Sequence, residues 1–172
     1  MAKVLMIIAQ EGYKEEELEI PKAILKDAGH DVKVASLSRM KATGAKGTVI
    51  QPDMAVGEVN ADFFDCIVVV GGPGSPALAE SKEVINLIIE ARKKDKQLAA
   101  ICLGPMTLAK AGALTGKKAT VFSNRDAIKL LRDTGAKYVD EAVVVDEKVV
   151  TADCPASAEP FGKKLVEVLK KG

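Results

Sequence analysis

The chain has 172 residues, of which 48% are hydrophobic and 28% charged, and its formal net charge is +1 at pH 7. A chain of this length buries roughly 70% of its unfolded surface, so we expect one domain over residues 1–172 that folds without disulfides. Because lysines and arginines are spread along the chain, the composition argues against binding to nucleic acid or to a membrane surface.

The first half of the chain alternates strand-length apolar runs with helix-length segments. Strands are predicted at residues 4–9, 31–37 and 66–70, and helices at residues 14–28 and 80–94. Short hairpin strands and turns are predicted over residues 41–59, which contain Gly44, Gly47, Pro52 and Gly57. The first apolar run is too short for a signal sequence and lacks a cleavage-like site, so we expect a cytoplasmic protein.

The second half continues the alternation. Predicted here are a strand at 97–101, a short helix at 103–111, a strand at 119–122, a helix at 125–132, a hairpin of 142–146 and 148–152, and a helix at 158–170. Continuous apolar strands separated by helices are typical of βαβ units, so the fold class is α/β, with a mainly parallel sheet covered by helices on both faces. Ligands bind such sheets at the carboxyl ends of the strands, where loops 10–17, 71–76 and 102–105 lie.

The segment Ala99-Ala100-Ile101-Cys102-Leu103-Gly104-Pro105 predicts a sharp turn from a strand into a helix. A cysteine at this bend lies above free N–H groups of a helix N-terminus, which lower a thiol pKa from about 8.5 to roughly 3.5–7.5. Cys102 is therefore a candidate nucleophile. The alternative is a buried structural cysteine, which is our interpretation of Cys66.

Glu17 is the candidate acid beside this thiol. At helical spacing it shares one face with three apolar residues that we expect to point inward: Ile20, Ile24 and Ala28. Pro21 removes the hydrogen bond to the Glu17 carbonyl and bends the backbone there. Three further acidic residues at the helix start are expected to be solvent-exposed charges: Glu15, Glu16 and Glu19.

The run Val70-Gly71-Gly72-Pro73-Gly74 follows a buried strand and lacks bulk. It favours close approach of the Gly71 and Gly72 backbone N–H groups, with that of Leu103, to a negatively charged oxygen. The alternative is a plain glycine-rich turn. Since Pro76 occupies the sixth position, the run is not a dinucleotide-binding motif.

Together these residues resemble the ThiJ/PfpI superfamily, which includes glyoxalases and deglycases on one branch and intracellular proteases on the other. The resemblance covers the whole chain and rests on four segments: Glu17 to Pro21, Gly71-Gly72, Ala100 to Pro105 and Thr151-Ala152-Asp153-Cys154-Pro155. It implies a flavodoxin-like three-layer sandwich, a nucleophilic Cys102 and a protonated Glu17 hydrogen-bonded to the thiolate. It also implies a pocket near Cys154 and Pro155, and a homodimer or larger homo-oligomer.

The chain departs from the family pattern where relatives carry proton-transferring groups. Leu103 occupies the position of the histidine that follows the nucleophile in the protease branch, and Ala77 that of its acidic partner. Phe122 lies near the position where the glyoxalase branch often has a histidine. The single histidine, His30, is predicted at the opposite end of the sheet, so one chain supplies no Cys–His dyad.

Three functions remain open from the sequence. The first is a cysteine-dependent enzyme of the glyoxalase or deglycase type, in which Cys102 forms a hemithioacetal with a small carbonyl compound and Glu17 carries the proton. The others are an intracellular cysteine peptidase and a non-catalytic redox sensor that responds through Cys102 oxidation. Cys154 is either a resolving thiol for Cys102 or a small apolar pocket residue. No cofactor and no metal ion is expected.

Overall fold

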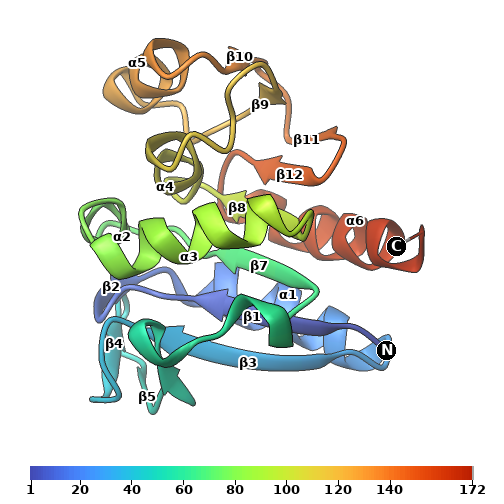
Figure 1. Cartoon of the computed structure of the whole chain (residues 1–172). Coiled ribbons are helices and arrows are strands. Elements are labelled where there is room, and N and C mark those ends of the chain that lie inside the picture. Colours follow the sequence, from blue (N-terminus) through green and yellow to red (C-terminus); the bar gives the residue numbers. More distant parts are fainter. Residues whose placement is uncertain (172) are drawn as a thin grey trace.

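The computed structural model describes residues 1–171, which build a seven-stranded sheet with helices on both faces (Figure 1). In spatial order its strands are β11 (Val143–Asp146), β12 (Val149–Ala152), β8 (Gln97–Ile101), β7 (Cys66–Val69), β1 (Lys3–Ile7), β3 (Asp31–Ser36) and β6 (Met54–Ala55). Every neighbouring pair is parallel except β11 and β12. The predicted α/β class with a mainly parallel sheet is confirmed.

Two apolar clusters lie on opposite faces of this sheet, as expected when strand side chains alternate. On one face, α1 (Glu15–Asp27) and α6 (Ala158–Lys171) pack together and contribute Leu18, Leu25, Phe161 and Leu165. The other face is covered by α2 (Pro76–Ala79), α3 (Lys82–Lys93), α4 (Pro105–Lys110) and α5 (Arg125–Asp133). In Figure 1, α3 crosses the near side of the sheet and α1 lies behind it.

Short elements complete the chain. A three-stranded sheet is formed by β2 (Glu11–Tyr13), β4 (Ala42–Gly44) and β5 (Val49–Ile50), and a two-stranded one by β9 (Lys118–Ala119) and β10 (Lys137–Tyr138). Three 3₁₀ turns are η1 (Val56–Glu58), η2 (Ala61–Phe63) and η3 (Pro155–Ser157). The hairpin strands expected within residues 41–59 are present, whereas the strand expected at 119–122 is wrong, because pairing is limited to Lys118–Ala119.

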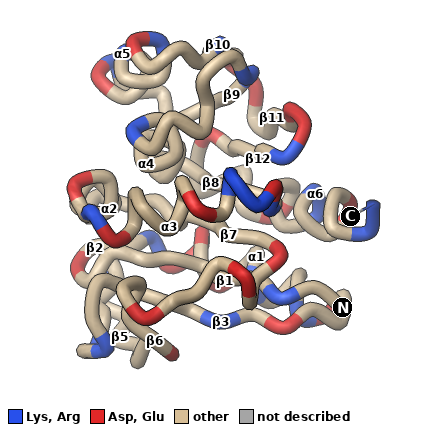
Figure 2. The backbone as a smooth tube through the Cα atoms, in the orientation of Figure 1, with Lys and Arg blue, Asp and Glu red and all other residues tan. Residues whose placement is uncertain are grey.

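Charged residues of both signs are interspersed over most elements (Figure 2). Among residues 1–171, no helix is both long enough and apolar enough to span a membrane.

The buried stripe of α1 differs from the one predicted. The apolar residues that face the core are Leu18, Pro21 and Leu25, whereas Ile20 is 38% exposed and Ala28 is exposed. The helix is therefore rotated relative to the expected stripe, because α6 and the sheet together cover its Leu18 side. Glu17 is nevertheless fully buried.

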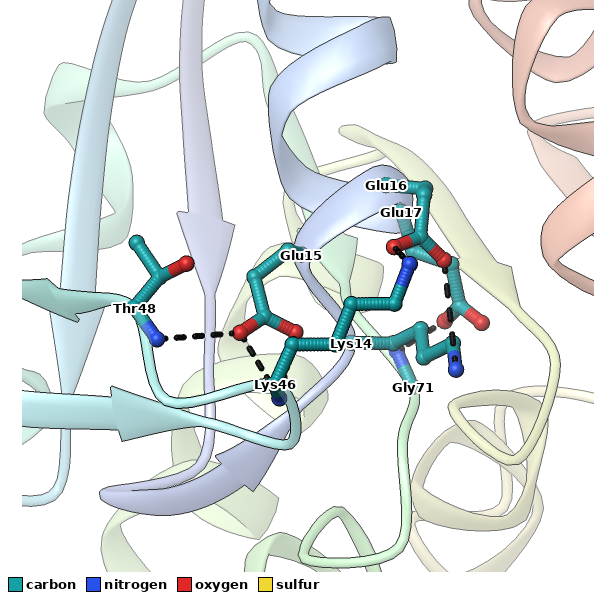
Figure 3. Close-up of polar contacts among 7 residues, drawn as sticks. All are labelled: Lys14, Glu15, Glu16, Glu17, Lys46, Thr48 and Gly71. Atoms are coloured by element: carbon teal, nitrogen blue, oxygen red, sulfur yellow. Dashed lines mark hydrogen bonds and ion pairs between the residues drawn. The ribbon is translucent and has the colours of Figure 1, made fainter.

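Glu15 is buried as well, which corrects the expectation that it is a surface charge. Its carboxylate accepts hydrogen bonds from the backbone N–H groups of Lys46 (2.9 Å) and Thr48 (3.2 Å), as Figure 3 shows. Burial by itself raises the pKa of this carboxyl, but the backbone hydrogen bonds outweigh burial and the pKa lies below its ordinary value. The carboxylate thereby fixes the turn between β4 and β5 against the start of α1.

Candidate active site

Cys102 lies at the turn between β8 and α4. Its φ of +63° is unusual for a residue other than glycine, and backbone bonds on both sides hold it there. The Cys102 N–H donates to the Ala152 carbonyl (2.9 Å), and its carbonyl accepts from the Phe122 N–H (2.8 Å). A Cβ on Gly104 would come within 2.4 Å of the Val69 carbonyl oxygen, so only glycine allows α4 to begin this close to β7.

Glu17 approaches this turn from α1. Its Oε1 accepts a 2.9 Å hydrogen bond from the Gly71 N–H, drawn in Figure 3. Its Oε2 is buried and has no hydrogen-bond partner among residues 1–171, and the nearby Cys102 thiol acts to lower the pKa of the carboxyl. Oε2 is thus the carboxyl oxygen that no other residue among 1–171 occupies.

Burial and the mutual contact raise the pKa of both groups. Desolvation raises the pKa of Glu17 to about 7, against the lowering effect of the Cys102 thiol and the Gly71 N–H. Desolvation, with the negative charge of Glu17, raises the pKa of Cys102 to about 12. Each ionisation opposes the other, so the two protons leave in separate steps that belong to the pair and not to either residue alone.

The expectation that the helix N-terminus lowers the pKa of the Cys102 thiol is wrong, because the pKa is raised. Cys102 is only 6% exposed, and desolvation and Glu17 outweigh the N–H groups of Leu103 and Gly72, which do act to lower the pKa. Cys66, inside β7, is fully buried, and burial raises the pKa of its thiol to about 12. A structural role fits Cys66.

The three backbone amides predicted to stabilise a negative charge have different partners. The Gly71 N–H is occupied by Glu17, whereas the N–H groups of Gly72 and Leu103 act on the Cys102 sulfur. Gly72 has a φ of +116°, and a Cβ there would come within 2.5 Å of the Gly12 carbonyl oxygen. The donors to the Cys102 sulfur are consequently Gly72 and Leu103, while the Gly71 N–H holds the Glu17 carboxyl.

Gly71→Ala is expected to separate Glu17 from the thiol. The added Cβ would lie 2.6 Å from Glu17 Oε1 and 2.8 Å from the Cys102 Cβ, and a contact of 2.5 Å with the Ile101 carbonyl oxygen prevents the backbone from yielding. We expect unfolding free energy to fall by about 1–3 kcal/mol in urea titrations, with an altered thiol titration. In the control Gly57→Ala, the Cβ meets only a side-chain carbon at 3.7 Å, so both should be unchanged. An unaltered thiol titration in Gly71→Ala would show that Gly71 does not position the acid.

Cys154 and Pro155 are half-buried and follow β12, the parallel neighbour of β8. The Cys154 Sγ lies 3.6 Å from the Ser157 Oγ, and all three cysteines are free thiols. That these residues line the substrate pocket stays a prediction. The buried Ser157 was missed in the sequence, because a serine near a helix start has no distinctive pattern.

The positions that depart from the family pattern provide no substitute for a histidine. Leu103 is half-buried, Ala77 is exposed on α2, and Phe122 is 38% exposed. The Nδ1 of His30 accepts from the Ala2 N–H (2.9 Å) at the start of β3, the opposite edge of the sheet from Cys102. Within residues 1–171, no three His, Cys, Asp or Glu side chains gather in a way that could hold a metal ion.

Comparison with known proteins gives consistent matches over the full length. A family model described as the DJ-1/PfpI family matches residues 2–168. The chain is 41% identical over 171 residues to an uncharacterised protein of Methanocaldococcus jannaschii, covering 99% of this chain and 83% of that protein. It is 32% identical over 167 residues to a deglycase of Thermococcus kodakarensis, covering 96% of this chain and 99% of the deglycase.

One further relative and one solved structure also match the chain over nearly its whole length. A glutathione-independent glyoxalase of Caenorhabditis elegans is 31% identical over 166 residues, with 96% of this chain and 88% of the glyoxalase covered. Among solved structures, a ThiJ/PfpI domain protein from Brachyspira murdochii has a TM-score of 0.94 and 29% identity, with 99% of this chain and 97% of that chain covered.

Proposed function

The chain belongs to the DJ-1/PfpI family, and we propose that it is a cysteine-dependent enzyme that converts reactive 2-oxoaldehydes such as methylglyoxal into 2-hydroxy acids. The observation that carries the proposal is the burial of the Glu17 carboxyl beside Cys102, on either side of Gly71, with the Gly72 and Leu103 amides acting on the sulfur. We infer that the thiol and the carboxyl share one proton. Relatives named deglycase and glyoxalase support the same class of substrate.

The shared proton suits the first step. The Cys102 thiolate adds to the aldehyde carbon, and Glu17 donates its proton to the carbonyl oxygen as the new carbon–sulfur bond forms, giving a hemithioacetal. The Gly72 and Leu103 N–H groups are the nearest donors for charge that develops at this centre.

The Glu17 carboxylate left by this step is the base for the second. It removes the proton from the carbon that bears sulfur and returns a proton to the adjacent carbon, while the hemithioacetal hydroxyl passes its proton to the neighbouring oxygen. These transfers convert the hemithioacetal into the thioester of a 2-hydroxy acid. Water then cleaves the thioester, which releases the acid and restores the thiol. The net reaction is addition of one water molecule to the 2-oxoaldehyde.

Peptide hydrolysis makes a demand that this site does not meet. An amide nitrogen leaves only when it is protonated, a task usually given to a histidine near the nucleophile, and His30 lies at the other edge of the sheet. An aldehyde carbon is far more electrophilic and needs a single proton carrier. We therefore place an intracellular peptidase second. The homodimer and the cytoplasmic location stay predictions.

A comparison of substrates tests the proposal. We expect the purified chain to convert methylglyoxal into lactate, measured by proton NMR, at a low rate because no histidine assists the proton transfers; that assistance is typically worth about 10²–10⁴-fold. Acetaldehyde is the matched control, since it lacks the adjacent carbonyl and cannot form the 2-hydroxy acid. Peptide cleavage that depends on Cys102, without lactate formation, would overturn the proposal.

A further inference from the structure

Cys102 and Cys154 leave neighbouring strands at the same edge of the sheet. In the parallel pair of β8 and β12, Ile101 lies opposite Ala152, and the Cys102 N–H donates to the Ala152 carbonyl at 2.9 Å. Neighbouring strands are about 4.8 Å apart, and disulfides join Cα atoms about 4.4–6.8 Å apart. Ile101 and Ala152 lie within that range, and Cys102 and Cys154 follow them by one and two residues.

The alternation of side chains along β12 places Cys154 on the face of the sheet where Cys102 lies. Val150 and Ala152 belong to the same apolar cluster as Ile101 and Cys102. Cys154 is two residues beyond Ala152, and its backbone remains extended (φ −160°, ψ 169°). Since side chains of an extended chain alternate, Cys154 continues the row formed by Val150 and Ala152.

The Cys154 sulfur contacts Ser157, which is in turn hydrogen-bonded to Asp153. The Ser157 Oγ donates to Asp153 Oδ1 at 2.7 Å, so this hydroxyl has used its only proton. The contact of 3.6 Å between the Cys154 Sγ and the Ser157 Oγ then has the thiol as donor and the hydroxyl as acceptor. A proton that leaves Cys154 passes to Ser157, while the Ser157 proton passes to Asp153.

We propose that Cys154 is a resolving thiol that closes a reversible disulfide with Cys102 after a hydroperoxide has oxidised Cys102. In the first step the Cys102 thiolate attacks an oxygen of the hydroperoxide and the oxygen–oxygen bond breaks, which leaves Cys102 as a sulfenic acid. The leaving alkoxide or hydroxide takes a proton from solvent and departs as the alcohol or as water. In the second step the Cys154 sulfur attacks the Cys102 sulfur and the sulfur–oxygen bond breaks. The Cys154 proton moves through Ser157 to Asp153, and Glu17 protonates the departing hydroxide to water.

The disulfide blocks the sulfur that the proposed carbonyl chemistry uses, so it switches the site off. It also protects Cys102, because a sulfenic acid that finds no thiol takes up more oxygen and passes to the irreversible sulfinic acid. The inference needs only a nucleophilic Cys102 sulfur and is independent of the reaction proposed above. Cys66, fully buried in β7, is an internal control, because no peroxide reaches it in the folded protein.

Time-resolved intact mass measurement during hydrogen peroxide treatment, with peptide mapping under non-reducing conditions, tests the inference. The wild type should lose two hydrogen atoms, show a linked Cys102–Cys154 peptide pair, retain a free Cys66 thiol and return to its starting mass with dithiothreitol. Cys154→Ser should instead gain two oxygen atoms at Cys102 and resist dithiothreitol. Mapping of the wild type suffices even if this variant does not fold.

Ser157→Ala tests whether proton transfer from Cys154 through Ser157 to Asp153 speeds disulfide closure, beyond the closeness of the two thiols. It removes the acceptor of the Cys154 proton, so sulfenic acid should form at the wild-type rate while the disulfide closes at least about tenfold more slowly. Ser157→Thr restores a hydroxyl and should restore the rate. Direct passage of wild-type Cys102 to the sulfinic acid, or a bond between two chains or to Cys66, would overturn the inference. All readouts are masses, so they hold even if the carbonyl activity is absent.

Discussion

Cys102→Ser is expected to reduce kcat/KM for methylglyoxal by at least about 10³-fold, since removal of a covalent nucleophile is among the largest single effects in enzymes. The serine hydroxyl is a much weaker acid than a thiol, and Glu17, with a pKa raised only to about 7, is too weak a base to ionise it. Serine matches the shape of cysteine, so the turn between β8 and α4 should be retained. Lactate formation and far-ultraviolet circular dichroism measure the two properties.

Cys66→Ala is the matched thiol control for this variant. Cys66 lies inside β7 and is fully buried, away from the turn that holds Cys102. Loss of its sulfur should lower the free energy of unfolding by about 1 kcal/mol and leave kcat/KM within about twofold of the wild type. If Cys102→Ser retained wild-type turnover while Cys66→Ala lost it, the nucleophile would have been assigned to the wrong cysteine.

The layers of the fold could be predicted because a parallel sheet with two covered faces imposes near-continuous apolar strands. Residues 66–70 and 97–101 show that pattern clearly, and their order with the intervening helices determines the architecture. Strands β2 and β6 were not predicted individually, since two or three residues carry no periodicity and exist through their pairing partners. The strand expected at 119–122 is wrong because only Lys118 and Ala119 have a pairing strand, β10.

The face of α1 could not be read reliably from spacing alone. Two apolar stripes are possible at helical spacing, one through Ile20 and Ile24 and one through Leu18, Pro21 and Leu25, and the second is the one that is fully buried. Gly162 of α6 lies against both Pro21 and Ile24, so Ile24 is half-buried and only Ile20 is left exposed on the first stripe. Glu17 would be buried with either stripe, because it lies three residues before Ile20 and four residues before Pro21. The burial of Glu15 depends on the β4–β5 turn, which supplies the N–H groups that its carboxylate requires.

The composition of the site was visible in the sequence, but its electrostatics were not. A helix N-terminus beside Cys102 suggests a lowered pKa, and the amides of Gly72 and Leu103 do act in that direction. Burial and the contact with Glu17 outweigh them, and both depend on how α1 packs on the sheet. The division of labour between Gly71 and Gly72 likewise depends on the hydrogen bond from Gly71 to Glu17.

Glu17→Gln is expected to shift the rising limb of the pH profile toward higher pH and to lower the maximum by about 10²-fold. In the wild type both groups are protonated at low pH and no thiolate exists. As pH rises through about 7 the pair loses one proton, so kcat/KM should rise through this value and then level off. The remaining proton is lost only near pH 12, beyond the working range.

The glutamine variant has no carboxyl proton to lose, so the thiol must ionise alone. Removing the charge of Glu17 lowers the pKa of Cys102 from about 12, but burial still raises it, so a single step should lie between the two wild-type steps. The pH dependence of kcat/KM and the ultraviolet absorbance of the thiolate should report the same step. Glu17→Asp keeps a titrating carboxyl on a shorter side chain and should retain two steps with reduced activity. A rising limb that stays near pH 7 in Glu17→Gln would assign that ionisation to another group, and the shared-proton mechanism would fail with it.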